Sequence, residues 1–317
     1  MDMDVLFAGT AASAPTARRG LPATLLRRGG EKLLFDCGEG TQRQLVRSVG
    51  LLQIDAVFIT HFHADHVLGL PGMLKTYGLQ AREVPLRVFG PPGLRRLFGV
   101  LGPVIGRLPF EVELEELSAG AELEREGYKL AAFEVAHGVP ALGYALLEEE
   151  RPGRFDEARA RELGVQPGPD FGRLQHGEAV GDVTPDQVLG EARPGRRVVI
   201  AGDSAPCEMT QAVAWRADLL VHEATFSDED AARAKETAHS TARGAAELAA
   251  AAEVKLLALT HISSRYPVSA LQDEARSAFE NTIIPRDFDR VELPFPERGE
   301  PAHIRESAGE GKPPPPA

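Results

Sequence analysis

One short stretch decides how this chain is interpreted: Thr60-His61-Phe62-His63-Ala64-Asp65-His66. It holds three imidazoles and one carboxylate within six residues, directly after the apolar run 56–60. That run predicts a buried strand, because it is rich in β-branched and aromatic residues. Neutral imidazole nitrogens and carboxylate oxygens are common zinc ligands. The stretch therefore indicates a metal site at the end of a strand.

The spacing of these residues suits two ions. On extended chain, His61 and His63 point to the same side and can bind one ion together. Asp65 and His66, where the chain turns, can face a second ion beside the first. The alternatives are a solvated histidine-rich loop or core histidines satisfied by hydrogen bonds. Four ligand-type residues at this density, following a buried strand, argue against both.

Two ions need more ligands, and three further candidates each follow a predicted strand: His137, Asp203 and His261. Folds that mix strands and helices tend to place their chemistry at the carboxyl ends of strands. Taken singly, each candidate is equally compatible with a structural role. Together they complete two sites, one of His61, His63, His137 and Asp203 and one of Asp65, His66, Asp203 and His261. Asp203 is shared as the bridge, and each ion keeps an open position for water.

The composition is that of a soluble globular protein, with 43% hydrophobic and 26% charged residues among 317. The chain starts with the acidic segment 1–4 and has no apolar run of the ~20 residues that a membrane helix needs, so we expect a cytoplasmic protein without membrane association. Two cysteines make no disulfide framework. The net charge of −12 argues against non-specific binding to DNA. A nucleic-acid enzyme stays possible, because a metal site supplies positive charge locally.

The chain divides into three parts. Residues 1–292 form one catalytic domain with alternating strands and helices. Within it, about 151–197 carry Pro-Gly pairs and little apolar periodicity, which predicts a protruding arm. Residues 293–317 are rich in proline, glycine and charge, so we expect a disordered tail. The predicted strands are 5–7, 23–26, 32–36, 56–60, 86–88, 111–114, 130–135, 143–147, 197–201, 219–221 and 256–260, and the predicted helices are 42–46 and 245–252.

The pattern His61-x-His63-x-Asp65-His66, with the three later ligand candidates, resembles the metallo-β-lactamase superfamily. The resemblance implies an α/β (α+β) fold, a four-layer αββα sandwich with a protruding arm and two zinc ions per subunit at one edge. Manganese or iron could replace zinc. The motif is weak for substrate, because the fold hosts lactamases, thioesterases, sulfatases, phosphodiesterases and nucleases.

Other segments narrow the substrate, and together they are similar to the ribonuclease Z family over about residues 1–290. These segments are 7–10, 35–42, 69–72, 137–144, 221–226, 239–242 and 260–266. The family implies an endoribonuclease that removes the 3′ trailer from precursor tRNA, leaving a 3′-hydroxyl on the tRNA and a 5′-phosphate on the trailer. It also implies a homodimer in which the arm of one subunit holds RNA while the other subunit cleaves. The arm is not basic, as an RNA clamp would be expected to be: residues 151–197 hold eight arginines and eight acidic residues.

Three residues are candidates for proton transfer. Imidazole titrates near neutral pH, so His239 can protonate the departing ribose oxygen, with Glu223 orienting it. His239 also precedes an alanine-rich helix, where its neighbours would cap the helix, and both roles can hold at once. The family implies that Asp65 combines metal binding with proton acceptance.

Two rival functions stay open. One is another hydrolase of this fold, such as a small-substrate phosphodiesterase, an arylsulfatase or a thioesterase, which would need no arm. The other is a non-catalytic RNA-binding subunit. The complete ligand set argues against the second rival.

Overall fold

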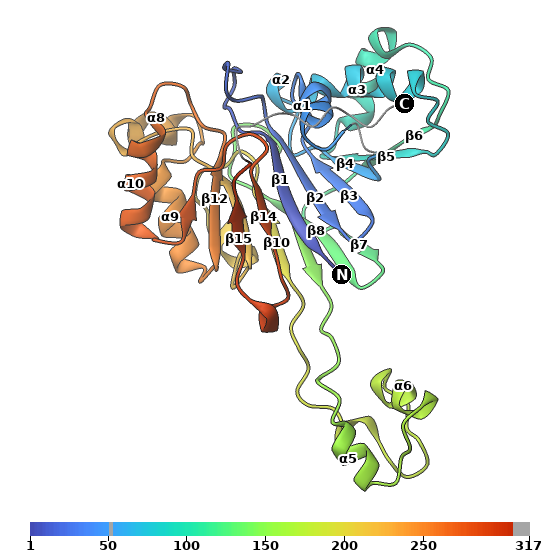
Figure 1. Ribbon diagram of the computed structural model, residues 1–317. Helices are drawn as coiled ribbons and strands as arrows, with labels where there is room; N and C mark the ends of the chain where they lie inside the picture. The colour runs from blue at the N-terminus through green and yellow to red at the C-terminus, as the bar shows by residue number, and fades with distance from the viewer. Residues whose placement is uncertain (51–52, 307–317) are drawn as a thin grey trace.

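The computed structural model describes residues 1–50 and 53–306, and in this part of the chain two β-sheets lie face to face (Figure 1). The eight-stranded sheet has the order β15-β14-β1-β2-β3-β4-β5-β6, and the seven-stranded sheet has the order β13-β12-β11-β10-β9-β8-β7. The first sheet's strands are β1 (Met3–Gly9), β2 (Ala23–Arg28), β3 (Glu31–Phe35), β4 (Ala56–Phe58), β5 (Leu86–Gly90), β6 (Val112–Glu116), β14 (Arg290–Glu292) and β15 (Ala302–Ile304). The second sheet's strands are β7 (Glu122–Arg125), β8 (Tyr128–Glu134), β9 (Leu142–Glu148), β10 (Arg197–Ile200), β11 (Leu219–Glu223), β12 (Leu256–Thr260) and β13 (Thr282–Ile283).

Strands in the middle of each sheet, such as β1 and β11, are apolar on both faces and therefore have nearly continuous hydrophobic runs. In β1, Val5 and Phe7 pack in the core between the sheets, while Leu6 packs in the core on the outer face. In β11, Leu219 lies in the inner core and Leu220 in the outer core of the second sheet. Because successive side chains alternate across a strand, each sheet supports two cores.

Helices cover the outer face of each sheet and complete four layers. The first sheet is covered by α1 (Thr41–Ser48), α2 (Ala64–Val67), α3 (Gly69–Leu79) and α4 (Leu94–Ile105), and the second by α7 (Glu208–Val213), α8 (Ala231–Glu236), α9 (Ala242–Ala251) and α10 (Val268–Ala278). The predicted αββα sandwich is confirmed. Among residues 1–50 and 53–306, none of the helices has the length and apolar character that crossing a membrane requires.

Between β9 and β10 the chain leaves the sandwich and forms an arm that projects far from both sheets (Figure 1). The arm carries α5 (Glu157–Glu162), α6 (Pro169–Gln175) and a short 3₁₀ helix, η1 (Pro185–Gln187). A small apolar cluster of its own holds these pieces together, formed by Ala160, Val165, Leu174, Val183 and Val188. The arm therefore has a folded tip.

The segment that follows β14 differs from the sequence prediction of a disordered tail from residue 293. Residues 293–306 contain the 3₁₀ helix η3 (Pro296–Arg298) and β15, which pairs antiparallel with β14 through Val291 and His303. The pairing covers the edge of β14, which would otherwise present unpaired backbone groups. The last 25 residues are rich in proline, glycine and charge, and this composition gives no signal for a three-residue strand. Residues 307–317 lie outside the described residues.

Candidate metal centre

The seven predicted ligands converge at one edge of the sandwich, where several strands end. β4, β8, β10 and β12 end at Phe58, Glu134, Ile200 and Thr260, and the loops after them carry His61, His137, Asp203 and His261. His63 precedes α2, and Asp65 and His66 lie within it. The short α2 therefore turns Asp65 and His66, the last two ligand candidates of the histidine stretch, toward the same edge.

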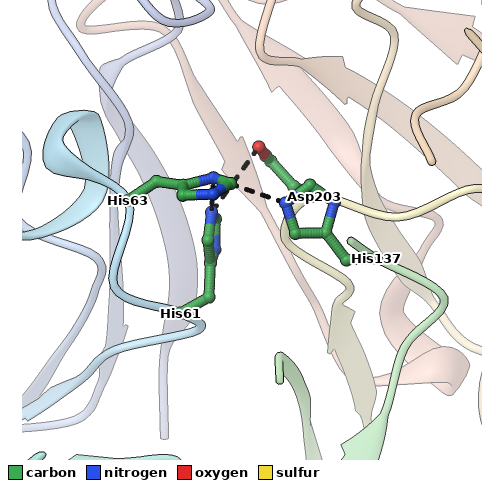
Figure 2. Close-up of side chains that lie close together, drawn as sticks. All are labelled: His61, His63, His137 and Asp203. Carbon is green, nitrogen blue, oxygen red and sulfur yellow. Dashed lines mark hydrogen bonds and ion pairs between the residues drawn. The ribbon is translucent and has the colours of Figure 1, made fainter. Parts of the chain in front are cut away.

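The first group consists of His61, His63, His137 and Asp203, whose side chains point toward one another in Figure 2. One ligand atom from each lies within 4.8 Å of the others. His61 Nε2 is 2.8 Å from His63 Nδ1, and His137 Nε2 is 3.4 Å from the same atom. His61 Nε2 lies 3.9 Å from Asp203 Oδ2. Four donor atoms thus surround one small space.

The second group lies beside the first and consists of Asp65, His66 and His261, again with ligand atoms within 4.8 Å of one another. Asp203 Oδ2 is 3.4 Å from His66 Nε2 and 3.3 Å from His261 Nε2. His261 Nε2 is also 3.3 Å from Asp65 Oδ2. Asp203 therefore lies between the two groups, in the bridging position that the sequence analysis expects.

Hydrogen bonds on the side that faces away from the centre fix the orientation of the His66 and His61 rings. His66 donates from Nδ1 to Asp36 Oδ2 at 2.7 Å. The Thr60 hydroxyl donates to the same carboxylate at 3.0 Å, so it accepts from His61 Nδ1, also at 3.0 Å. In their neutral forms both rings therefore carry a lone pair on Nε2, which faces the centre. Outer partners of this kind set the tautomer of metal-binding histidines.

His261 and His137 are oriented in the same way. The Thr225 hydroxyl donates to Glu223 Oε2 and accepts from His261 Nδ1 at 2.8 Å. His137 Nδ1 donates to the backbone oxygen of Ala238 at 3.2 Å. In their neutral forms these four imidazoles thus direct N–H groups outward and lone pairs inward.

The inward-facing atoms fit divalent cations. The Nε2 atoms of His66 and His261 lie 3.3–3.4 Å from a carboxylate oxygen of Asp203, an arrangement that needs positive charge, supplied either by a proton on the ring or by a bound cation. Among the described residues, His66 Nε2 is buried without a hydrogen-bond partner. The donor set, imidazole nitrogen with carboxylate oxygen, is one that zinc and other divalent transition metals bind. Metal dependence follows from this geometry and from the fold.

Burial and the neighbouring groups set the charge of the side chains at the centre. Burial opposes protonation of His66, but Asp203 and Asp36 raise its pKa well above the usual range, so a bound cation would replace that proton. Burial lowers the pKa of His61 to about 2, so this ring is neutral, as a ligand must be. Burial opposes ionisation of Asp203, but the neighbouring His261 and His66 hold the pKa of that carboxyl well below its usual range. For Asp65, burial is likewise outweighed, chiefly by the hydrogen bond to His261, and its pKa is about 2. Both carboxylates are therefore ionised at neutral pH.

Glu223 and His239 form a hydrogen-bonded pair beside the centre. His239 Nδ1 donates to Glu223 Oε1 at 2.6 Å, and the same oxygen accepts from the Ser204 backbone N–H at 2.8 Å. Burial lowers the pKa of His239, but the hydrogen bond to Glu223 and the negative charges of Glu223, Asp203 and Asp65 together raise it more, so the net shift is upward. Thr241, two residues on, caps α9 by accepting from Gly244 N at 3.0 Å. Helix capping and the histidine pair therefore coexist.

The sequence analysis did not assign the outer partners Asp36, Thr60 and Thr225. Asp36 offered the same signal as the ligands, because it follows β3 directly. Its backbone has φ 58°, and His261 has φ 55°, a left-handed conformation uncommon for such residues. Strain of this kind persists where surrounding contacts hold it, often at functional sites.

Comparison with known proteins identifies relatives over nearly the whole chain. The metallo-β-lactamase superfamily model matches residues 19–261. Ribonuclease Z from Gemmatimonas aurantiaca is 50% identical over 310 residues, which covers 94% of this chain and 98% of that protein. Ribonuclease Z from Myxococcus xanthus is 48% identical over 300 residues, and the match covers 91% of this chain and 97% of that protein. The crystal structure of the short form of human tRNase Z has a TM-score of 0.68 at 29% identity and covers 92% of this chain and 99% of its own. The chain belongs to the ribonuclease Z family of the metallo-β-lactamase superfamily.

Proposed function

We propose that this protein is a metal-dependent endoribonuclease that hydrolyses precursor tRNA and removes the 3′ trailer. The products are a tRNA with a 3′-hydroxyl and a trailer with a 5′-phosphate. The observation that carries the proposal is the complete set of seven ligand candidates beside the Glu223–His239 pair. Identity of 50% to a ribonuclease Z over 94% of the chain supports the substrate.

The two groups of ligands would hold two zinc ions, with manganese or iron as alternatives. His61, His63, His137 and Asp203 would hold one ion, and Asp65, His66 and His261 would hold the other with the shared Asp203. When bound, the ions supply activation of water at neutral pH and positive charge opposite the phosphodiester. The outer hydrogen bonds of Asp36, Thr60 and Thr225 keep the imidazoles in the tautomer that this requires.

Side chains of this protein move the protons. Asp65, ionised at neutral pH, accepts a proton from the attacking water. The bond between phosphorus and the ribose 3′ oxygen breaks, and that oxygen needs a proton. His239 supplies it from Nε2, because Nδ1 is committed to Glu223. Glu223 is 1% exposed and accepts three further hydrogen bonds, from Ser204 and Thr225, so it is itself fixed and orients the imidazole.

His239→Ala should lower kcat for precursor cleavage by about 10²–10⁴-fold, the usual contribution of a positioned acid. Glu223→Gln should have a smaller effect in the same direction, because the imidazole stays but loses its charged partner. The metal content of both variants should equal that of the wild type, which separates proton donation from metal binding. Retention of more than about a tenth of kcat by His239→Ala would remove this residue from the mechanism.

The arm and the centre lie at opposite ends of the second sheet. β9 begins at Leu142, whose N–H bonds Thr60 O at 2.9 Å beside the centre, and ends at Glu148, where the arm begins. The arm then points away from the centre (Figure 1). An arm placed in this way cannot reach its own centre. We therefore propose a homodimer in which each arm holds the tRNA that the partner subunit cleaves.

An exposed apolar surface supports the dimer. Val100 and Val104 lie one turn apart on α4 and are 70% and 71% exposed, and Leu79 at the end of α3 is 85% exposed. α3 and α4 contact each other, so these side chains lie on neighbouring helices. Exposed apolar side chains on neighbouring helices are groups that contact with a second chain would bury.

Val104→Glu should convert the dimer to monomer at micromolar concentration, because it places a charge in the apolar surface. The control is Val268→Glu on α10, a 37% exposed valine on a helix of the opposite layer, which should leave the dimer intact. Sedimentation velocity measures both. A wild-type monomer, or a Val104→Glu dimer as tight as the wild type, would contradict this interface.

Cleavage of a precursor tRNA tests the function. Purified protein should release one trailer with a 5′-phosphate, a chelator should abolish the reaction, and Zn²⁺ should restore it. A small-substrate phosphodiesterase would instead cleave chromogenic diesters and leave the precursor intact. Since the substrate is an intracellular RNA, we also propose a cytoplasmic location.

A further inference from the structure

The segment 293–298, between β14 and β15, lies against the root of the arm. We define the arm root as residues 149–153, where the chain leaves β9, and residues 190–196, where it returns to β10. Arg151 and Arg193 pair across it, with backbone N–H to oxygen distances of 2.8 Å in both directions. A Cβ added to Gly153 would lie 2.0 Å from Gly190 O, so the two strands touch. The root is a narrow two-stranded ribbon.

Glu297 binds both strands of this ribbon. Its Oε1 and Oε2 accept from Arg151 Nη1 and Nη2 at 2.9 and 2.8 Å, a bidentate pair. Oε1 also accepts from Arg193 Nη1 at 3.2 Å. A single carboxylate from the C-terminal segment thus connects the outgoing strand with the returning one.

Phe295 connects the same root to the sandwich. Its ring lies between two guanidinium groups, with the Cζ of Arg151 3.5 Å and that of Arg196 4.0 Å from its centroid. Arg196 is 1% exposed and donates to Leu293 O at 2.9 Å and to both oxygens of Glu148 at 2.7 and 2.8 Å. The contact series therefore runs from a buried ion pair outward to the arm.

The direction of the arm depends on its root. The arm tip has its own apolar cluster, and in the described part of the chain the hydrogen bonds and ion pairs that join it to the sandwich are those of the root. A small change of angle at the ribbon moves the distant tip by a large distance. The ion pairs of Glu297 with Arg151 and Arg193 are partly exposed and contribute little to folding stability, so we assign orientation of the arm as their role.

We propose that Phe295 and Glu297 are positioning residues that hold the arm in the direction in which it receives precursor tRNA. The inference rests on the proposed function, and specifically on the arm as the part that holds RNA. It also gives a reason for a carboxylate at the root of an RNA-binding arm, where a negative charge by itself opposes binding to phosphate.

Glu297→Gln tests the inference through the direction in which it changes KM for precursor tRNA. Removing a negative charge near bound RNA should by charge alone strengthen binding and lower KM. If Glu297 positions the arm, KM for precursor tRNA should instead rise by about tenfold with kcat little changed. Phe295→Leu should act in the same direction. The matched control, Glu300→Gln, removes the same charge from a 74% exposed side chain two residues beyond this segment and should leave KM unchanged or lower it.

Two further measurements distinguish a change in the arm from damage to the metal centre. Activity on bis(p-nitrophenyl) phosphate should match the wild type in every variant, because the metal centre lies at the other end of the sheet. Small-angle scattering should show a broader distribution of maximum dimensions for the Phe295→Leu/Glu297→Gln double variant, with or without RNA. An unchanged or lower KM for Glu297→Gln, a parallel loss on the small diester, or unchanged scattering of the double variant overturns the inference. A wild type that leaves precursor tRNA intact overturns the proposed function instead.

Discussion

Asp203→Asn should lower cleavage of precursor tRNA by about 10³-fold or more, because the charge stabilisation that bound metal supplies is worth several kcal/mol. Asp203 Oδ2 lies 3.3–3.9 Å from imidazole nitrogens of both ligand groups, so one substitution weakens both. Asparagine keeps the volume and removes only the charge. Metal content should fall together with activity on precursor tRNA and on small diesters.

A matched control exists in the same sheet. Asp218 is also buried, at 5% exposed, but it precedes β11 at the end opposite to the centre, where it binds Arg197 N at 2.8 Å and Lys255 Nζ at 2.9 Å. Asp218→Asn should lower thermal stability while metal content per folded chain stays at the wild-type level. An Asp203→Asn protein with wild-type metal content and activity would show that Asp203 is no ligand.

Removing the arm should also have a large effect, with a different pattern. Residues 154–189 can be replaced by a short glycine linker between Gly153 and Gly190, whose backbones already touch. We expect kcat/KM for precursor tRNA to fall by about 10²-fold or more, because a second attachment point for the RNA is lost. Activity on bis(p-nitrophenyl) phosphate should stay within about twofold, because the metal centre and its ligands are intact.

The pair of substrates distinguishes the arm from the centre. Loss of both activities in the arm deletion would show that the arm supports the fold or the centre and does not serve to hold tRNA. Unchanged cleavage of precursor tRNA would show that the arm, which carries equal numbers of arginines and acidic residues, makes no contribution to RNA binding.

The convergence of the seven ligand candidates could be predicted because each carries a local signal. The histidine stretch is contiguous, and His137, Asp203 and His261 each follow a run of strand-forming residues. Parallel strands that end at one edge bring such residues together without further information. The four-layer fold was predictable through the family motif, and it is confirmed by the two sheets and their covering helices.

What the sequence did not show depends on tertiary contacts. The strand predicted over 56–60 ends at Phe58, because Thr60 N bonds the Asp36 side chain at 2.8 Å instead of continuing the ladder. The roles of Asp36 and Thr225 appear only when the rings that they orient are in place. The C-terminal segment reads as a tail by composition, yet Glu297 binds the arm from more than a hundred residues away in sequence.

Metal titration of the stripped protein tests the central claim most directly. Protein treated with a chelator and dialysed should be inactive on precursor tRNA, and added Zn²⁺ should restore cleavage with saturation at two ions per chain. Full cleavage by protein that holds less than about a tenth of an ion per chain would contradict the account, because the seven convergent side chains would then serve no metal-dependent reaction.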